Sequence, residues 1–146
     1  MSLAPTLAEL GWSADFAESF VPYATTATPG RVARVDRSAY DVLTADGAVR
    51  AVAALPVARA AETDPTRAPT VGDWAAVAPA PDAGGPAVVV DLLPRRSEVV
   101  RGAGRRATSA QVLAANVDVL LLITAAAPAA PLNRVERFLT LSLIHI

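Results

Sequence analysis

Hydrophobic and polar positions alternate through the first two thirds of the chain, with short apolar runs separated by turn-forming residues. Tyr40, Val42 and Thr44 lie two apart and would share one face of a strand. The alternation predicts five short strands, over residues 31–36, 39–44, 48–54, 71–78 and 87–93. The intervening stretch 55–70 carries three prolines and many polar residues, and is interpreted as a long exposed loop. This arrangement predicts an OB-fold, a five-stranded Greek-key barrel.

A helical period precedes the strands. Trp12, Phe16 and Phe20 recur every four residues, so they would lie on one face of a short helix that Ser13 caps. An aromatic stripe at this spacing is typical of a packing face. Trp74 and Tyr40 have two interpretations, as base-stacking platforms or as buried barrel residues, and the Val- and Ala-rich strand around Trp74 favours burial.

The pattern changes again near the end of the chain. Thr108 or Ser109 is placed to cap a short helical turn over 111–115, and the continuous apolar run 118–124 predicts a strand buried on both faces of a parallel sheet. An amphipathic helix is predicted from residue 133 to 139. Strand followed by helix is the first unit of an α/β domain whose remaining strands are not encoded here.

The last six residues, 141–146, do not continue this pattern. They match the in-frame translation of a sequencing adaptor, so we expect them to be an artefact and expect His145 to carry no biological information.

Composition removes several classes of chemistry. The chain of 146 residues has no cysteine and a single histidine, which excludes a cysteine nucleophile, a disulfide scaffold and any His or Cys metal cluster within it. All thirteen basic residues are arginine. The phosphate-binding P-loop and the guanine-reading Asn-Lys-x-Asp motif both require lysine, so neither exists in this sequence. The start of the chain does not resemble a secretion signal, and prolines interrupt the longest apolar stretch, so we expect a cytoplasmic protein without a membrane span.

Charge is segregated along the chain. Residues 1–94 carry eleven acidic residues against six arginines, whereas 95–106 carry five arginines against Glu98. Such a positive cluster suits phosphate contacts, and it is equally typical of a solvated connector between domains. Gly102-Ala-Gly104-Arg-Arg-Ala107 also matches the dinucleotide-binding fingerprint, but no buried strand leads into it and no acidic residue occupies the ribose position, which argues against an oxidoreductase.

Four segments together resemble a known family. They are Gly30–Val35, Val71-Gly-Asp-Trp74, Leu93-Pro-Arg-Arg-Ser97, and Gln111–Asp118 with the apolar run that follows it. Their order and spacing resemble the N-terminal part of the ribosome small subunit-dependent GTPase A family, circularly permuted GTPases that act on the small ribosomal subunit. The resemblance covers residues 10–139 and ends before that family's nucleotide-binding motifs.

The resemblance implies a domain plan. Residues 1–28 form a helical lead-in, 29–94 an OB domain, 95–106 an arginine-rich connector, and 107–140 the start of a circularly permuted GTPase domain. The complete parent would use GTP and Mg²⁺, and a further C-terminal domain would hold zinc; the fragment itself is expected to bind none of these and to be inactive alone.

The resemblance also implies partners. The parent would act late in the assembly of the small ribosomal subunit as a cytoplasmic monomer, and its OB domain would contact ribosomal RNA. The arginines placed to touch RNA are Arg31, Arg34, Arg37, Arg95, Arg96, Arg101, Arg105 and Arg106.

A stand-alone OB module that binds RNA or single-stranded nucleic acid remains the alternative. The segment 111–124 separates the two interpretations, because a lone OB module has no need of a buried parallel strand after its barrel.

Overall fold

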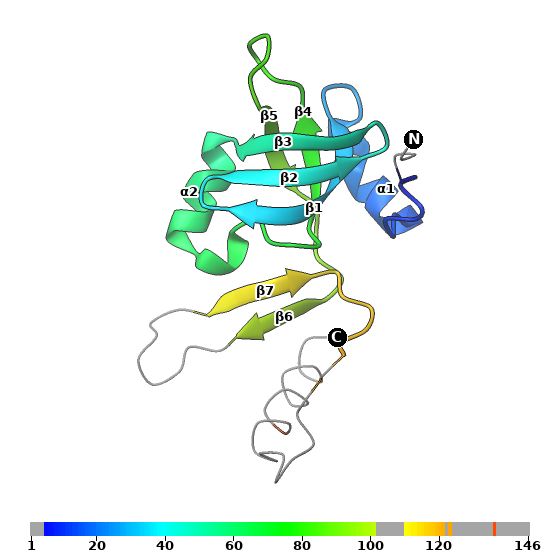
Figure 1. Ribbon diagram of the computed structural model, residues 1–146, viewed down its shortest axis with the longest axis vertical. Coiled ribbons are helices and arrows are strands. Elements are labelled where there is room, and N and C mark those ends of the chain that lie inside the picture. The colour runs from blue at the N-terminus through cyan, green and yellow to red at the C-terminus, as the bar shows by residue number, and fades with distance from the viewer. Residues whose placement is uncertain (1–4, 102–109, 122, 124–135, 137–146) are drawn as a thin grey trace.

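The computed structural model describes residues 5–101, 110–121, 123 and 136 (Figure 1). Its centre is a barrel of five strands: β1 (Thr28–Asp36), β2 (Ala39–Thr44), β3 (Gly47–Ala53), β4 (Trp74–Ala78) and β5 (Ala87–Leu92). The strand order is β1-β2-β3-β5-β4, and β4 pairs with β1 to close the barrel. Every pair is antiparallel except β3 with β5. The predicted OB-fold is therefore confirmed.

Small side chains fill the barrel. Its interior cluster consists of Val32, Tyr40, Val42, Ala51, Ala75, Val77 and Val89. Tyr40, Val42 and Thr44 share the inward face of β2, as the alternation predicts. A Cβ atom at Gly30 would lie 2.5 Å from Val42 Cγ1, so only glycine lets β1 approach β2 this closely.

Helix α1 (Ala14–Phe20) covers the outer face of β4 and continues into the 3₁₀ turn η1 (Val21–Tyr23). Phe16 and Phe20 pack with Trp74, Ala76 and Leu93 in a second buried cluster, and the Trp12 ring lies 4.7 Å from the Trp74 ring. The aromatic stripe is thus a packing face, as predicted. Ser13 occupies the N-cap position, but its side chain makes no capping hydrogen bond.

The segment between β3 and β4 differs from the sequence prediction. The expected loop over 55–70 contains helix α2 (Leu55–Thr63) and the 3₁₀ turn η2 (Pro65–Arg67). Two of the three prolines that suggested a loop, Pro56 and Pro65, lie in the first turns of these helices, where a residue needs no intrahelical N–H bond. Asp64 adds a cap by accepting a hydrogen bond from Thr66 N at 3.0 Å. The next strand begins at Trp74, three residues later than predicted, because residues 71–73 form a turn instead.

A second, two-stranded sheet lies below the barrel in Figure 1. Strand β6 (Glu98–Arg101) pairs antiparallel with β7 (Gln111–Ala115), and we call this pair the β6–β7 hairpin. The helical turn predicted over 111–115 is therefore wrong, and residues 98–101 of the predicted connector form a strand. Val112 and Ala115 are buried three residues apart, a spacing that a helix would also give, so it is the ladder with β6, irregular between Val99 and Val100, that makes this segment a strand.

The predicted strand over 118–124 is absent from the part of it that the structure describes. Residues 118–121 and 123 are not in a strand, and Val119, Leu121 and Ile123 are about four-fifths exposed, at 82%, 78% and 83%. A strand buried on both faces needs neighbouring strands, and the described residues supply none beside it. Glu136 is helical, within the predicted helix 133–139, whose other residues lie outside the described part, as do residues 141–146. Among the helices described, none has the length and apolar character needed to cross a membrane.

Replacing Phe16 with alanine is expected to destabilise the fold by about 3 kcal/mol, because it empties a buried aromatic site beneath α1. Trp74, now fully buried, would become hydrated and its fluorescence would shift to longer wavelength. Urea unfolding followed by tryptophan emission measures both effects. Val21→Ala is the control, since Val21 is 68% exposed, and its stability should match the wild type. Equal stability of the Phe16 variant and the control would contradict a packed α1.

Candidate nucleic-acid interface

Two arginines lie exposed where β1 turns into β2. We call these two strands and their connecting turn, residues 28–44, the β1–β2 arm. Arg34 is on β1, and Arg37 is in the turn that leads into β2, where its φ is +33°. Neither forms an ion pair with another described residue. Arg50 on β3 contacts Asp36 at 3.0 Å and Asp41 at 2.7 Å, so its single positive charge offsets one of these two carboxylates. The hydrogen bonds to Asp41 and Asp36 raise the pKa of Arg50. Arg34 and Arg37 outweigh the one carboxylate charge that Arg50 leaves unbalanced, so this end of β1 and β2 stays positively charged overall.

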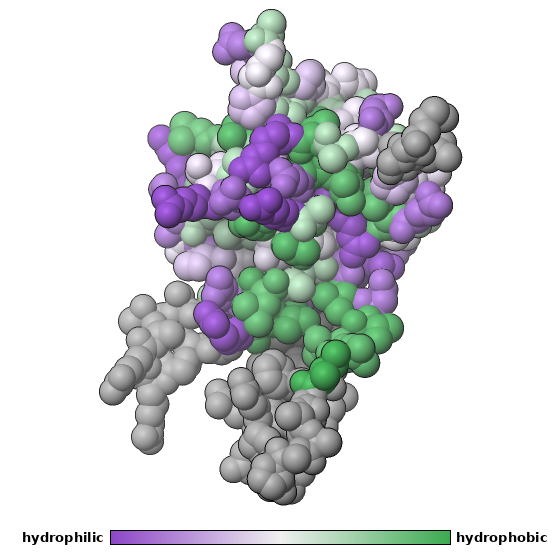
Figure 2. All heavy atoms as spheres, in the orientation of Figure 1, coloured by the Kyte–Doolittle hydropathy of each residue, from purple (hydrophilic) through white to green (hydrophobic). Residues whose placement is uncertain are grey.

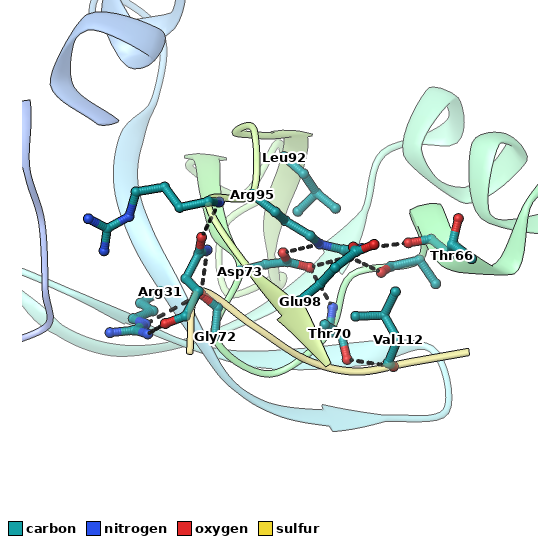
Figure 3. Close-up of polar contacts among 12 residues, drawn as sticks. Arg31, Thr66, Thr70, Gly72, Asp73, Leu92, Arg95, Glu98 and Val112 are labelled. Carbon is teal, nitrogen blue, oxygen red and sulfur yellow. Dashed lines mark hydrogen bonds and ion pairs between the residues drawn. The ribbon is translucent and has the colours of Figure 1, made fainter. Parts of the chain in front are cut away.

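Arg95 makes a different kind of contact, with its side chain only 15% exposed and surrounded by hydrogen-bond acceptors (Figure 3). Its Nε and Nη2 atoms donate to the two oxygens of Asp73 at 2.7 and 2.8 Å. Its remaining hydrogens go to Thr66 O at 2.6 Å, Ala68 O at 2.9 Å and Glu98 Oε2 at 3.2 Å. A guanidinium has five N–H donors, and all five are used here. The hydrogen bond to Asp73 is also the main reason that the pKa of Arg95 is raised.

The use of all five Arg95 donors within the protein bears on the predicted contact of this residue with RNA. Arg95 has no donor left for a phosphate in this geometry, so its contacts stabilise the fold, and its predicted contact with RNA stays a prediction. Its carboxylate partner Asp73 is fully buried and also accepts a hydrogen bond from Thr70 N at 2.8 Å. Both charges are thus paired and hydrogen-bonded, as burial requires.

Arg31 is also engaged internally. Its guanidinium donates to the carbonyl oxygens of Leu10, Gly72 at 3.4 Å and Asn116 at 3.0 Å, and it lies 5.9 Å from the centre of the Trp74 ring. One side chain therefore connects the N-terminal segment, the barrel and the segment after β7. Like Arg95, it holds the fold together, and the predicted RNA contact at this position is not supported by its geometry.

Asn116 ends the hairpin and fixes it to the barrel. Only 2% exposed, it adopts a left-handed backbone with φ +53°, which asparagine tolerates better than most residues. Its amide Nδ2 donates to Gly72 O at 3.0 Å, and its Oδ1 accepts from Arg96 N at 2.9 Å. Ala115 N donates to Val71 O at 2.9 Å. We call these contacts of Arg31, Val71, Gly72, Ala115 and Asn116 the hairpin junction.

The other predicted contact arginines have mixed environments. Arg96 lies 4.9 Å from the centre of the Phe16 ring and 3.7 Å from an oxygen of Asp118, with its side chain 43% exposed. Arg101 is exposed on β6 and donates to Gln111 Oε1 at 2.8 Å, which leaves most of its donors free. Arg105 and Arg106 lie outside the described residues.

Two grooves lie beside the β6–β7 hairpin. The first, about 510 Å³, lies between α2, β5 and β6 and includes Asp91, Glu98 and Arg67 in its lining. The second, about 550 Å³, lies between the barrel and the β6–β7 hairpin, and Arg101 is its one charged lining residue among those that the structure describes. In Figure 2, hydrophobic residues gather on the lower part of the described surface. The exposed large hydrophobic residues of β7 and the segment after it include Leu113, Val119 and Leu120.

Aromatic side chains do not form a base-stacking platform on the described barrel. Tyr40 lies in the barrel interior and Trp74 lies beneath α1, so the base-stacking interpretation of both is wrong. Tyr23 lies beside α1, and its hydroxyl donates to Asp91 at 2.6 Å, which raises the pKa of Tyr23. Any contact with RNA by the described barrel would therefore rest on charge rather than on stacking.

The fold places the chain in the class of OB-fold proteins, whose barrels bind oligonucleotides or oligosaccharides through one face and the adjoining loops. No family model matches the chain. It is 42% identical over 137 residues to the small ribosomal subunit biogenesis GTPase RsgA of Streptomyces coelicolor, an alignment that covers 93% of this chain and 36% of that protein.

Two further relatives carry the same name. The protein of Streptomyces avermitilis is 42% identical over 137 residues, covering 93% of this chain and 35% of the relative. That of Opitutus terrae is 38% identical over 147 residues, covering 94% and 39%. The chain belongs to the ribosome small subunit-dependent GTPase A family, and it spans little more than a third of the length of these relatives.

Sequence reasoning missed the residues that hold this region together. Asp73 and Asn116 were part of the segments that carried the family resemblance, but neither was singled out. The signal that marks them is that both are polar residues within runs of Val, Ala and Trp. A buried polar residue in such a run needs a partner, and each finds it far along the chain.

Asp73→Asn is expected to destabilise the protein by about 3 kcal/mol, because it leaves the largely buried Arg95 guanidinium with only the more exposed Glu98 as a counter-charge. Chemical denaturation at neutral pH measures the change. Asp36→Asn is the control: it removes one carboxylate from the exposed Arg50 cluster and should change stability very little. Equal effects of the two substitutions would show that the Asp73–Arg95 pair does not stabilise the fold.

Proposed function

We propose that this chain is the N-terminal part of a GTPase that acts in biogenesis of the small ribosomal subunit, and that its OB barrel contacts ribosomal RNA. The proposal includes a late step of assembly, a cytoplasmic location and a monomeric state. It is supported by three relatives named small ribosomal subunit biogenesis GTPase RsgA, at 38–42% identity along nearly the whole chain.

One observation carries the RNA-binding part. Arg34 and Arg37 lie exposed at the end of the β1–β2 arm and form no ion pair with another described residue, while Arg50 bridges Asp36 and Asp41 and offsets one of their two charges. The arm therefore ends in a net positive charge. The connection between the first two strands of an OB barrel is one of the loops with which these barrels bind nucleic acid. Phosphate contacts from free arginines supply affinity without selecting a sequence.

GTP hydrolysis would belong to the remainder of the proposed parent, with GTP, Mg²⁺ and a zinc site outside this chain. The sequence has no lysine, no cysteine and one histidine, so it supplies neither the P-loop lysine nor a zinc ligand set.

We predict that the purified chain does not bind guanine nucleotide, because the lysine that neutralises the phosphates is missing. Titration with a fluorescent GTP analogue in the presence of Mg²⁺ should show no saturable signal. Saturable binding at micromolar concentrations would contradict the assignment of the nucleotide site to the rest of the parent.

RNA binding by the chain should be weak and steeply dependent on salt. Replacing Arg34 and Arg37 together with glutamine is expected to reduce the slope of log K against log salt by about 0.7–0.9 for each phosphate that is no longer neutralised. Filter binding to small ribosomal subunits of Streptomyces coelicolor over a salt series measures this slope. Arg37→Gln and Arg59→Gln form a charge-matched pair, since Arg59 is also exposed but lies on α2. Equal slopes for the pair would exclude a specific role of the β1–β2 arm.

The alternative is a stand-alone OB module. It predicts equal affinity for unrelated single-stranded RNA and for small ribosomal subunits, whereas the ribosomal proposal predicts tighter binding to the subunits. Competition between the two ligands in the same assay separates them.

A further inference from the structure

The second groove, of about 550 Å³, runs along the β6–β7 hairpin, where Arg101, Gln111 and Leu113 line it. Its opposite side is lined by Pro65 and residues 68–71, together with Val35 of the β1–β2 arm. No carboxylate of the described residues lines it. Arg101 lines the groove itself, whereas Arg34 and Arg37 lie exposed near Val35 in the β1–β2 arm, outside the lining. This charge arrangement fits an anionic backbone.

The β6–β7 hairpin is fixed to the barrel at the end opposite Arg101. In Figure 1 the strands β6 and β7 meet the barrel where β7 ends, while the end that carries Arg101 lies on the side of the β1–β2 turn. The fixed end is the hairpin junction, where Asn116 bonds Gly72 O and Arg31 bonds Asn116 O. Gly72 has φ +92°, and a Cβ atom there would lie 2.0 Å from Ala115 O. Barrel and hairpin therefore meet backbone to backbone.

We propose that the hairpin junction makes the barrel and the β6–β7 hairpin one composite surface for an RNA backbone, with Asn116 as a positioning residue that itself contacts no RNA. This inference rests on the RNA-binding function proposed above. Asn116 is buried, so it acts only through the placement of Arg101 relative to Arg34 and Arg37. If the junction opens, the hairpin must be ordered again on binding, which costs affinity.

The test uses the full chain, two variants that open the junction from opposite sides, and small ribosomal subunits of Streptomyces coelicolor as the probe. Asn116→Ala removes the hydrogen bonds to Gly72 O and from Arg96 N. Gly72→Ala forces Ala115 away. Gly84→Ala is the matched control, because Gly84 has φ +80° and a Cβ atom added there would meet nothing within 4 Å. It imposes the same backbone strain without touching the hairpin.

Two readouts are needed. Amide hydrogen exchange at Val112 and Ala115 reports whether the hairpin has come loose, and the salt slope of binding reports how many phosphates the protein still neutralises. Both junction variants should lose protection at these amides while barrel amides such as Val42 stay protected. Their affinity should fall about tenfold and the slope by about 0.7–0.9, the value expected for a single phosphate. The Gly84 variant should match the wild type in both.

A loosened hairpin with unchanged affinity and slope would overturn the inference and leave the proposed function standing. Protection that persists in Asn116→Ala would overturn it as well, since Asn116 would then not hold the hairpin. If Gly72→Ala fails to fold, Asn116→Ala decides the matter alone. Absence of binding by the wild-type chain itself would overturn both the proposed function and this inference.

Discussion

The buried ion pair between Asp73 and Arg95 is the constraint on which the rest of the structure depends. Asp73 is the last residue of the turn that opens β4, and Arg95 follows β5, so the pair fixes the start of one barrel strand to the end of another. The same guanidinium bonds the carbonyl oxygens of Thr66 and Ala68 and the carboxylate of Glu98 on β6. A charge removed from water needs a hydrogen-bond partner for each donor. The partners of Arg95 come from the segment 66–68, from the turn before β4 and from β6, so the guanidinium holds these segments together at the end of β5.

The turn over 71–73 continues this arrangement on its other side. Val71 O accepts the amide of Ala115, Gly72 O accepts from Asn116 and Arg31, and Trp74 next to it fills the space beneath α1. Helix, barrel and hairpin thus share a single short segment as their common contact. The consequence is that residues 95–101 do not behave as an open linker. Their arginines divide into those that hold the fold and those that face solvent.

This division clarifies how charge relates to function here. A cluster of arginines in the sequence suggests phosphate binding, but a guanidinium whose five donors are used by carbonyl and carboxylate oxygens offers nothing to a ligand. Arg95 is of this kind. Arg31 is similar, because it donates to the carbonyl oxygens of Leu10, Gly72 and Asn116. The described arginines that remain open on this side of the molecule are Arg34, Arg37 and Arg101, from segments far apart in the chain. An RNA surface built from them depends on how rigidly the hairpin is held against the barrel.

The sequence by itself determined the barrel, because period-two alternation reports directly which strand face is buried, and it determined the aromatic packing face of α1 through its period of four. The family resemblance came from the same residues. Only the tertiary structure decided that prolines at 56 and 65 begin helices, that residues 111–115 pair as a strand with 98–101, and that Arg31 and Arg95 are structural. These outcomes depend on partners distant in the chain. Local periodicity contains no information about which distant carbonyl or carboxylate a side chain will meet.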